Sequence, residues 1–493
     1  MKDYINVIGG GLAGTEAAYQ ISKRGIKVKL YEMKPKKYSP AHSNSDLAEI
    51  VCSNSFKSNL HTNACGLLKE ELRRMDSLLI KIADSTSVPA GQALAVDREV
   101  FSKKVTEEIK NNPNIEIINE EVVNLEKLLE EAITIIATGP LTSDNLAKEI
   151  SKITKQDKLY FYDAAAPIVT KESINFDIAF WGDRYEQERG RDEELEDWRK
   201  RLESTKDKQN YINLPLEKEE YEAFYNNLVN AEVVELHNFE KREIFEGCMP
   251  IEIMAKRGED TLRFGPLKPV GFTNPTTGRR PYALVQLRQD DTEGNIFNLV
   301  GFQTNLKFGE QKRVFSGIPG LENAEFVKYG VMHRNTFIDS SKLLTNTYKM
   351  RNINNLYFAG QITGVEGYVE SISSGLMAGI NAVLNFKGEE EFTLPIETMT
   401  GALATYISTK NERFQPMNAN FGIVPVLERR IKDKKEKYKI LADRAMEKLE
   451  EAIKNKRFLN RLFFYVLYIS SLSSWALEVW DLIFLLYSLK TLW

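Results

Sequence analysis

Cysteine and histidine are scarce in this chain of 493 residues. Its three cysteines, Cys52, Cys65 and Cys248, are too few and too scattered for a disulfide framework, and none belongs to a CxxC pair. The four histidines form no HxxH or HxxxH pair, so we expect no metal site. This cysteine usage suits a reducing compartment, and we expect a cytoplasmic protein.

The chain also lacks a strong excess of either charge. Its 66 basic and 70 acidic residues give a formal net charge of −4, so any surface that binds nucleic acid has to be a local patch. Strand-like residues follow Met1 directly, which leaves no room for a signal peptide.

The first 32 residues carry the pattern of a dinucleotide-binding unit. An apolar run at residues 4–8 leads into Gly9-Gly10-Gly11-Leu12-Ala13-Gly14, a helix-like stretch follows, and a second apolar run ends at Glu32. We expect Gly9 to permit the tight turn, Gly11 to let the backbone approach a pyrophosphate, and Gly14 to let the helix pack on the strand. The helix N-terminus would face the phosphates, and Glu32 would accept hydrogen bonds from a ribose.

A second strand and helix of this kind lie far along the chain. Residues 355–361 read as a strand with a terminal glycine, and residues 371–382 form a run of small residues that would let a helix begin close to a ligand. Two glycine motifs more than 300 residues apart favour FAD over NAD, and the chain has no second complete GxGxxG. The predicted cofactor-binding residues are Gly9, Gly10, Gly11, Leu12, Ala13, Gly14, Glu32, Gly360, Gln361, Gly364, Gly367 and Tyr368.

Between these motifs we expect further regular elements. The pattern predicts helices over about 63–83 and over 97–110, the latter capped by Asp97, and a buried parallel strand within 132–140 that ends in a Gly-Pro turn. Short β-like runs lie at 160–161, 283–287 and 297–302, with proline and glycine between them. The charged segment 184–208 reads as a solvated helix or a loop.

These features predict an α/β protein with a Rossmann-like FAD-binding domain of the glutathione-reductase type and an inserted α+β domain. We assign residues 1–157 and 345–456 to the FAD-binding domain, and residues 158–344 to an inserted domain that handles the substrate or RNA.

The apolar tail at 457–493 is atypical for a soluble chain. Its length would allow a membrane span, but Glu478, Asp481 and four serines interrupt it, so we do not expect a clean span. A packed terminal helix, membrane contact and a tail that is an accident of this gene all stay open as alternatives.

Two of the cysteines have contexts that suit chemistry. Cys52 lies in a polar segment with Lys57 nearby, which would favour a thiolate, and Cys248 lies between Gly247 and a proline turn. Cys65 lies in a helix-like stretch, and we expect it to be a small core residue.

Several motifs together resemble the bacterial folate- and FAD-dependent tRNA (uracil-5-)-methyltransferases, and the resemblance covers most of residues 1 to about 450. The middle motifs are specific to that family. A broader relative is the flavoprotein that helps to install carboxymethylaminomethyl groups on wobble uridine. The motifs that carry the resemblance are Gly9 to Gly14, Glu49 to Ser58, Val88 to Arg98, Ala137 to Ser143, Tyr160 to Ala164, Phe245 to Arg257, Asp260 to Gly271 and Phe358 to Ala382.

The resemblance implies an activity and its cofactors. NAD(P)H would reduce FAD, 5,10-methylenetetrahydrofolate would supply the one-carbon unit, and C5 of a tRNA uridine in the T loop would receive it to give 5-methyluridine. Cys52 would be the nucleophile that adds to C6 of the uracil, and Cys248 would assist, for example by removing the C5 proton. The reverse assignment of the two cysteines stays open.

The resemblance leaves alternatives for the target and for the role. The same chemistry could act on a ribosomal RNA uridine, or the chain could be an FAD-dependent partner protein in wobble-uridine modification. Candidates for phosphate contact are the basic pairs Lys256-Arg257, Arg279-Arg280 and Lys312-Arg313, for which ordinary surface pairs are an equal alternative.

Overall fold

The computed structural model describes residues 2–156, 159–190, 192–205, 209–234, 249–330, 332–412, 414–429 and 431–454. Cys248 and the apolar tail at 457–493 therefore lie outside the described residues.

A parallel sheet of five strands contains both ends of the predicted nucleotide-binding pattern. β1 pairs with β2, with Ile8 opposite Tyr31, and β16 pairs with β7, with Phe358 opposite Ile136. The predicted strands within 132–140 and 355–361 are therefore confirmed, and they lie side by side although they are far apart in sequence. The strands, in sheet order, are β16 (Leu356–Phe358), β7 (Thr134–Ile136), β1 (Tyr4–Ile8), β2 (Lys27–Tyr31) and β6 (Ile115–Ile118).

Helices α1 (Leu12–Ser22) and α13 (Tyr368–Phe386) pack closely against each other. A Cβ atom added at Gly375 would lie 2.2 Å from the carbonyl oxygen of Ala13, and one at Gly379 would lie 2.9 Å from that of Ala17. The small residues of α13 were predicted to let the helix begin close to a ligand. They also let the backbones of α13 and α1 pack in direct contact.

The single helix predicted over 63–83 is wrong, because two helices occupy this range. Asn63 caps α2 (Ala64–Arg74), and Ser77 caps α3 (Leu78–Ser85). Between them, Asp76 adopts a left-handed backbone with φ of 57° and forms an ion pair with Lys23. A helix cannot continue through such a residue.

The helix predicted over 97–110 is confirmed as α4 (Arg98–Lys110). The carboxylate of Asp97 accepts hydrogen bonds from the backbone N–H groups of Glu99 and Val100, as an N-cap does. Near it lies an antiparallel sheet of three short strands, in the order β3 (Ser55–Ser58), β5 (Ala93–Val96) and β4 (Ser87–Val88). The other helical segments of this part are α5 (Leu125–Glu131), α6 (Asp144–Thr154), α12 (Ser340–Leu343), η4 (Gln361–Thr363), α14 (Met399–Ser408) and α15 (Lys434–Lys454).

A six-stranded sheet forms the middle of the chain and has its own buried apolar cluster, which includes Leu214, Val285 and Phe297. The β-like run predicted over 297–302 ends early, at Leu299. The strands, in sheet order, are β10 (Phe180–Trp181), β11 (Tyr211–Leu216), β12 (Ala283–Gln289), β13 (Ile296–Leu299), β9 (Ile168–Thr170) and β14 (Phe326–Lys328). The helices here are η1 (Lys171–Ser173), α7 (Leu195–Thr205), α8 (Lys218–Val229), α9 (Ile251–Ala255), α10 (Thr261–Phe264) and α11 (Phe308–Phe315).

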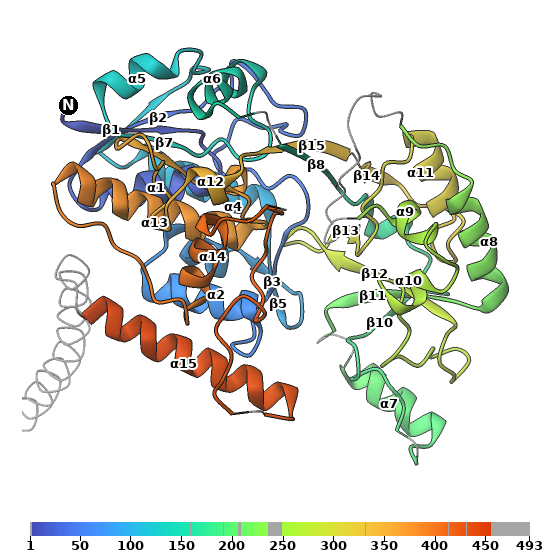
Figure 1. Ribbon diagram of the computed structural model, residues 1–493. Coiled ribbons are helices and arrows are strands. Elements are labelled where there is room, and N and C mark those ends of the chain that lie inside the picture. Colours follow the sequence, from blue (N-terminus) through green and yellow to red (C-terminus); the bar gives the residue numbers. More distant parts are fainter. Residues whose placement is uncertain are drawn as a thin grey trace, which may run out of the picture.

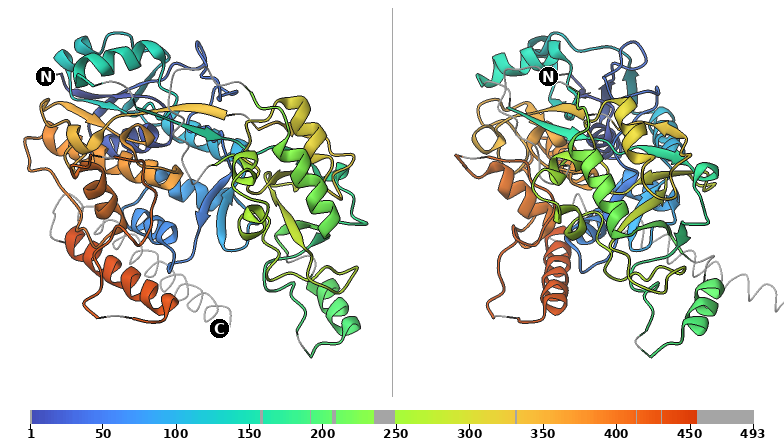
Figure 2. Two further views of the ribbon diagram at one scale, coloured as in Figure 1. Left: turned by 45° about the vertical axis from the view of Figure 1, so that its right-hand side comes forward. Right: turned by 90° about the vertical axis from the view of Figure 1, so that its right-hand side faces the viewer.

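The charged segment 184–208 contains α7, which lies at the outer end of this middle part (Figures 1 and 2). Trp198 anchors the helix, because its ring is fully buried and its indole N–H donates to the carbonyl of Gln187. The charged residues therefore lie on a helix, α7, that the buried Trp198 side chain anchors to the rest of the domain.

An antiparallel ribbon of two strands joins the two parts of the molecule (Figure 1). β8 (Leu159–Ala164) pairs with β15 (Met332–Phe337), with Leu159 opposite Phe337. In the described part of the chain, no helix has both the length and the apolar character that a membrane crossing requires.

Buried Glu71 on α2 fixes the start of α14. Its carboxylate accepts hydrogen bonds from the N–H groups of Met399 (2.6 Å) and Thr400 (2.8 Å) and from the Thr400 hydroxyl (2.7 Å). Burial raises the pKa of Glu71 from 4.5 to about 7, although these donors oppose the rise. Since the folded chain holds this proton more tightly than the unfolded chain, the contribution of Glu71 to stability falls as pH rises from 4.5 to about 7.

We predict that Glu71→Gln weakens the dependence of the melting temperature on pH across this window, because glutamine does not ionise. Glu70→Gln is the matched control, since Glu70 lies on the same helix but is partly exposed and pairs with Arg73. Thermal unfolding of the variants from pH 4.5 to pH 7 measures the effect. An unchanged pH dependence in Glu71→Gln contradicts the assignment.

Candidate functional site

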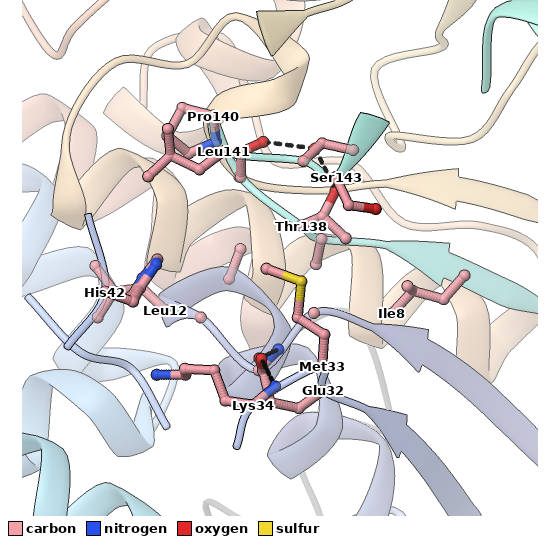
Figure 3. Close-up of a pocket in the computed structure, with 18 of the residues that line it drawn as sticks. Ile8, Leu12, Glu32, Met33, Lys34, His42, Thr138, Pro140, Leu141 and Ser143 are labelled. Atoms are coloured by element: carbon pink, nitrogen blue, oxygen red, sulfur yellow. Dashed lines mark hydrogen bonds between the residues drawn. The ribbon is translucent and has the colours of Figure 1, made fainter. Parts of the chain in front are cut away.

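A cavity lies at the carboxyl ends of the parallel strands. Parallel sheets bind their ligands at this edge. Figure 3 shows the cavity with part of its lining. The wall includes the glycine turn after β1, residues 31–34 after β2, residues 137–143 after β7, and Gly360 and Gln361 after β16.

The glycine turn divides into structural and open positions. Gly9 has φ of +103°, which only glycine adopts readily, and a Cβ at Gly14 would lie 1.8 Å from the carbonyl oxygen of Gly9. These observations agree with the roles predicted for Gly9 in the turn and for Gly14 in packing. A Cβ at Gly11, by contrast, would meet no described atom within 4 Å, so Gly11 faces open space in the cavity wall.

Glu32 lines the cavity and holds the turn in place. One carboxylate oxygen accepts from the N–H of Gly10 (2.8 Å), and the other accepts from the N–H of Lys34 (2.9 Å). Each oxygen keeps a second lone pair, which is what a ribose hydroxyl requires. Figure 3 shows Glu32 and Lys34 close together on the same wall.

The predicted residues after β16 fall into two groups. Gly360, Gln361 and Tyr368 line the cavity, whereas Gly364 and Gly367 are not part of its lining. A Cβ at Gly364 would lie 2.6 Å from the ring of Phe414, so that glycine has a packing cause. Leu12 and Ala13 do line the cavity, as predicted for a site at the start of α1.

The segment that carries Cys52 forms another wall of the cavity, through its neighbours Glu49 and Val51. The segment is bounded by left-handed residues, Ala48 (φ 52°) and Lys57 (φ 62°), and such residues concentrate at functional sites. The hydroxyl oxygen of Tyr368 accepts from the N–H groups of Cys52 (3.0 Å) and Ser53 (3.2 Å). Tyr368 thus touches the cavity with its ring and fixes the cysteine segment with its hydroxyl.

Burial raises the pKa of Tyr368 above its ordinary value, and the neighbouring Cys52 acts in the same direction. The phenol therefore stays protonated at neutral pH. Its proton remains free to serve as a donor while its oxygen accepts the two backbone N–H groups.

Two arginines connect Cys52 to the six-stranded sheet. Arg98 donates to the carbonyl of Cys52 (3.4 Å) and forms an ion pair with Asp290 (3.1 Å). Buried Arg288 donates to Ser53 (2.7 Å) and to Asn54 (3.1 Å) from β12. Positive charge beside a cysteine is the environment in which thiolates form.

Lys57, which is expected to favour a thiolate at Cys52, has an acidic partner of its own. The Lys57 ammonium forms an ion pair with buried Glu370 (3.3 Å), on the side of the segment where Cys65 lies. Burial opposes its charge, but Glu370 and other negative groups raise the pKa of Lys57 above its ordinary value.

The other two cysteines have different outcomes. Cys65 is buried in α2 and belongs to the main apolar cluster, so its predicted core role is confirmed. Cys248 lies outside the described residues, and the described chain resumes at Met249 just before α9. Within the described ranges, no group of three or more His, Cys, Asp or Glu side chains could hold a metal ion.

Sequence reasoning missed several polar residues of the wall. Lys34 forms a buried ion pair with Glu49 (3.2 Å), and His42 lies within 2.6 Å of the Ser39 hydroxyl. Lys34 could have been found by its place directly after β2, because residues that follow parallel strands gather at this edge. Nothing in the sequence pattern marks His42.

Two of the basic pairs suggested for phosphate contact contain partly neutralised arginines. Arg280 pairs with Glu188 (2.8 Å), and Arg313 pairs with Glu310 (2.7 Å). Ion pairing of this kind favours the reading of both as ordinary surface residues.

Known proteins match this chain over most of its length. Residues 4–390 match the family model described as Glucose inhibited division protein A. A curated relative from Acetivibrio thermocellus, named Methylenetetrahydrofolate--tRNA-(uracil-5-)-methyltransferase TrmFO, is 58% identical over 454 residues, or 92% of this chain and 99% of that protein. A relative of the same name from Bacillus pumilus is 55% identical over 456 residues, or 92% of this chain and 100% of that protein. The chain belongs to the TrmFO family.

Solved structures support the fold. GidA from Aquifex aeolicus matches with a TM-score of 0.62 and 17% identity, and the match covers 92% of this chain and 75% of that one. A second crystal form of the same protein gives the same TM-score. The predicted fold class is therefore confirmed.

The residues present fit a bound FAD. The open space at Gly11 lies at the N-terminus of α1, where a pyrophosphate would meet unpaired N–H groups. Glu32 stands where a ribose would lie, and Gly360, Gln361 and Tyr368 supply the distant part of the wall.

We predict that Gly11→Ala and Gly14→Ala fail for different reasons. The new methyl group of Gly11→Ala enters space meant for the cofactor, so FAD binding weakens by about tenfold or more (~1.4 kcal/mol) while the melting temperature of the apoprotein changes little. In Gly14→Ala the methyl group strikes the Gly9 backbone, which costs the apoprotein about 1–3 kcal/mol of stability.

Flavin absorbance of the purified proteins and thermal unfolding of the apoproteins measure both effects. If Gly11→Ala destabilised the apoprotein as much as Gly14→Ala, the division of the turn into open and structural positions would be wrong.

Proposed function

We propose that this chain transfers the one-carbon unit of 5,10-methylenetetrahydrofolate, with reduction by FAD and NAD(P)H, to C5 of the T-loop uridine of tRNA, and so forms 5-methyluridine. The TrmFO relatives carry the name of this reaction, and they match over nearly their whole length. The observation that carries the proposal is the position of Cys52, which follows Val51 of the cavity wall in a segment that Arg98 and Arg288 contact.

The parts of the chain divide between cofactor and RNA. Residues 1–157 and 345–456 bind FAD, and residues 158–344 form the inserted domain that contacts RNA. When bound, FAD supplies the reducing equivalents that it takes from the nicotinamide cofactor, and it relays the one-carbon unit of the folate. The protein works in the cytoplasm, and the tail at 457–493 has no assigned part in the reaction.

The cofactor is held by the residues of the cavity wall. Gly11 leaves room for the pyrophosphate at the N-terminus of α1, whose positive dipole end faces it, while Gly9 and Gly10 shape the turn. Glu32 orients the adenosine ribose, and the N-terminus of α13 together with Tyr368 bounds the far end of the cavity.

Cys52 activates the uridine. Its thiolate adds to C6 of the uracil and forms a C–S bond, and the ring electrons move to give an enolate whose C5 is nucleophilic. C5 then bonds to the one-carbon unit, a base removes the C5 proton, and the bond from that carbon to its carrier breaks. A hydride, which reduced FAD would supply when bound, brings the carbon to the methyl level, and the C–S bond breaks to restore the ring. Cys248 is the proposed base, and Arg98 and Arg288 favour the thiolate and fix the segment that carries it.

The first test uses the purified flavoprotein, unmodified tRNA, NADPH and methylenetetrahydrofolate labelled at the methylene carbon. We predict label in 5-methyluridine with the wild type, and a loss of about 100-fold or more in Cys52→Ala and Cys248→Ala. Cys65→Ala is the matched control and keeps most of the activity, since Cys65 is a core residue. Label in ribosomal RNA but not in tRNA would show that the substrate is a ribosomal RNA uridine. Label in neither RNA would favour the role of a partner protein in wobble-uridine modification.

A second arm assigns the two cysteines. A tRNA with 5-fluorouridine at the target has no C5 proton for a base to remove, so the covalent adduct with the nucleophile persists. The adduct forms with the wild type and Cys248→Ala but not with Cys52→Ala if the proposed roles are right. An adduct with Cys52→Ala but not with Cys248→Ala would exchange the roles of the two cysteines.

A further inference from the structure

Three aromatic rings form a stack on the surface of the middle part of the chain. Phe308 is the first residue of α11, Phe326 lies in β14, and Tyr329 follows that strand. The ring centroids of Phe308 and Tyr329 are 5.2 Å apart with an interplanar angle of 22°, and those of Phe326 and Tyr329 are 5.3 Å apart at 14°. The rings are thus nearly parallel, as in a column of stacked bases.

This stack is open to solvent at one end. Phe308 is 56% exposed, and neighbouring Val327 is 56% exposed as well. A large aromatic ring is usually buried, and its exposure on a rigid support suggests that a partner covers it. β14 is the edge strand of the six-stranded sheet, so further chain or ligand has access to it.

A lysine connects the stack to the catalytic segment. Lys328 lies between Phe326 and Tyr329, and its ammonium makes no hydrogen bond or ion pair with the residues that the structure describes. Burial lowers the pKa of Lys328, and the charges of Arg98, Glu49 and Cys52 act on it, so Lys328 lies in the neighbourhood of the Cys52 segment. Figure 1 shows β14 on the side of the six-stranded sheet toward the ribbon β8–β15 and the cofactor-binding part.

Other charged groups surround this lysine. Arg98 is paired with Asp290, Glu49 is paired with Lys34, and Arg288 is held by Ser53 and Asn54. Lys328 is therefore the cation of this group without such a partner among the described residues, which suits it to a phosphate.

The chemistry of the reaction calls for such a surface. A uridine whose C6 is to be reached by a cysteine has to leave its stack, and its neighbours then lose stacking partners. Proteins recognise unstacked RNA bases by stacking them on aromatic side chains and by contacting the phosphates with cations.

We propose that Phe308, Tyr329 and Phe326 form a stacking platform for an unpaired base next to the target uridine, with Lys328 on an adjacent phosphate. This inference rests on the proposed function, because it takes RNA as the substrate. It assigns the occupant of the exposed stack as RNA rather than another protein.

The test is the affinity of the purified flavoprotein for unmodified tRNA and for the isolated T-arm hairpin, measured by fluorescence anisotropy. Phe308→Ala weakens binding about tenfold, and Phe308→Trp retains it, because every base can stack on an indole. The matched control is Phe176→Ala, which removes a ring that is 41% exposed and stacked on Trp181 at the opposite edge of the same sheet. Flavin content and thermal unfolding establish that each variant is folded.

Two further readouts separate stacking from a general loss of binding. The fluorescence of 2-aminopurine, placed in turn on each side of the target uridine, is quenched by the wild type at one position and recovers in Phe308→Ala. Lys328→Gln lowers the slope of log affinity against log salt by about one, as the loss of one phosphate contact does.

The outcomes distinguish this inference from the proposed function. A wild type that methylates tRNA, with a Phe308→Ala variant that binds RNA as tightly and quenches as well, overturns the platform and leaves the function standing. A wild type that neither binds nor methylates tRNA overturns both. An equal loss of affinity in Phe176→Ala also refutes the platform, because the effect would not belong to this edge of the sheet.

Discussion

The hydroxyl group of Tyr368 holds together the two halves of the site. Its ring borders the cofactor cavity, while its oxygen accepts the backbone N–H groups of Cys52 and Ser53. Since Tyr368 begins α13, and α13 packs on α1 through Gly375, the position of the cysteine depends on the same helix pair that frames the glycine turn. The partly buried Tyr368 thus couples the geometry of the cofactor cavity to that of the segment that carries Cys52.

A second set of contacts ties this segment to the six-stranded sheet. Arg288 from β12 and Arg98 from α4 meet at residues 52–54, with Asp290 between them. The Cys52 segment is therefore held by elements from both parts of the molecule, and the aromatic stack with Lys328 extends the same region outward. If the proposed roles hold, the cofactor cavity, Cys52 and the aromatic stack are the parts that a group transfer from folate to a base would need close together.

The sequence was informative where local rules decide the structure. The turn at Gly9, the cap at Asp97 and the buried strand at 134–136 follow from backbone conformation and periodicity, and all three are present.

The helix predicted over 63–83 was wrong because Asp76, an ordinary residue, adopts a left-handed backbone where it forms an ion pair with Lys23. The ion pair of Lys57 with Glu370 could not be predicted from the sequence, because Glu370 lies more than 300 residues away. Arg288 could not be found at all, since its partners Ser53 and Asn54 are more than 200 residues away. The roles of Cys52 and Cys248 stay predictions.

The ribbon of β8 and β15 has a consequence for how such a protein can change over time. Leu159 and Phe337 face each other across the ribbon, so the chain leaves the cofactor-binding part and returns to it at one point. Residues gained or lost between them alter neither the spacing of β7 and β16 nor the register of their pairing. The part between the two strands can therefore vary in length and shape while the sheet that lines the cofactor cavity stays constant.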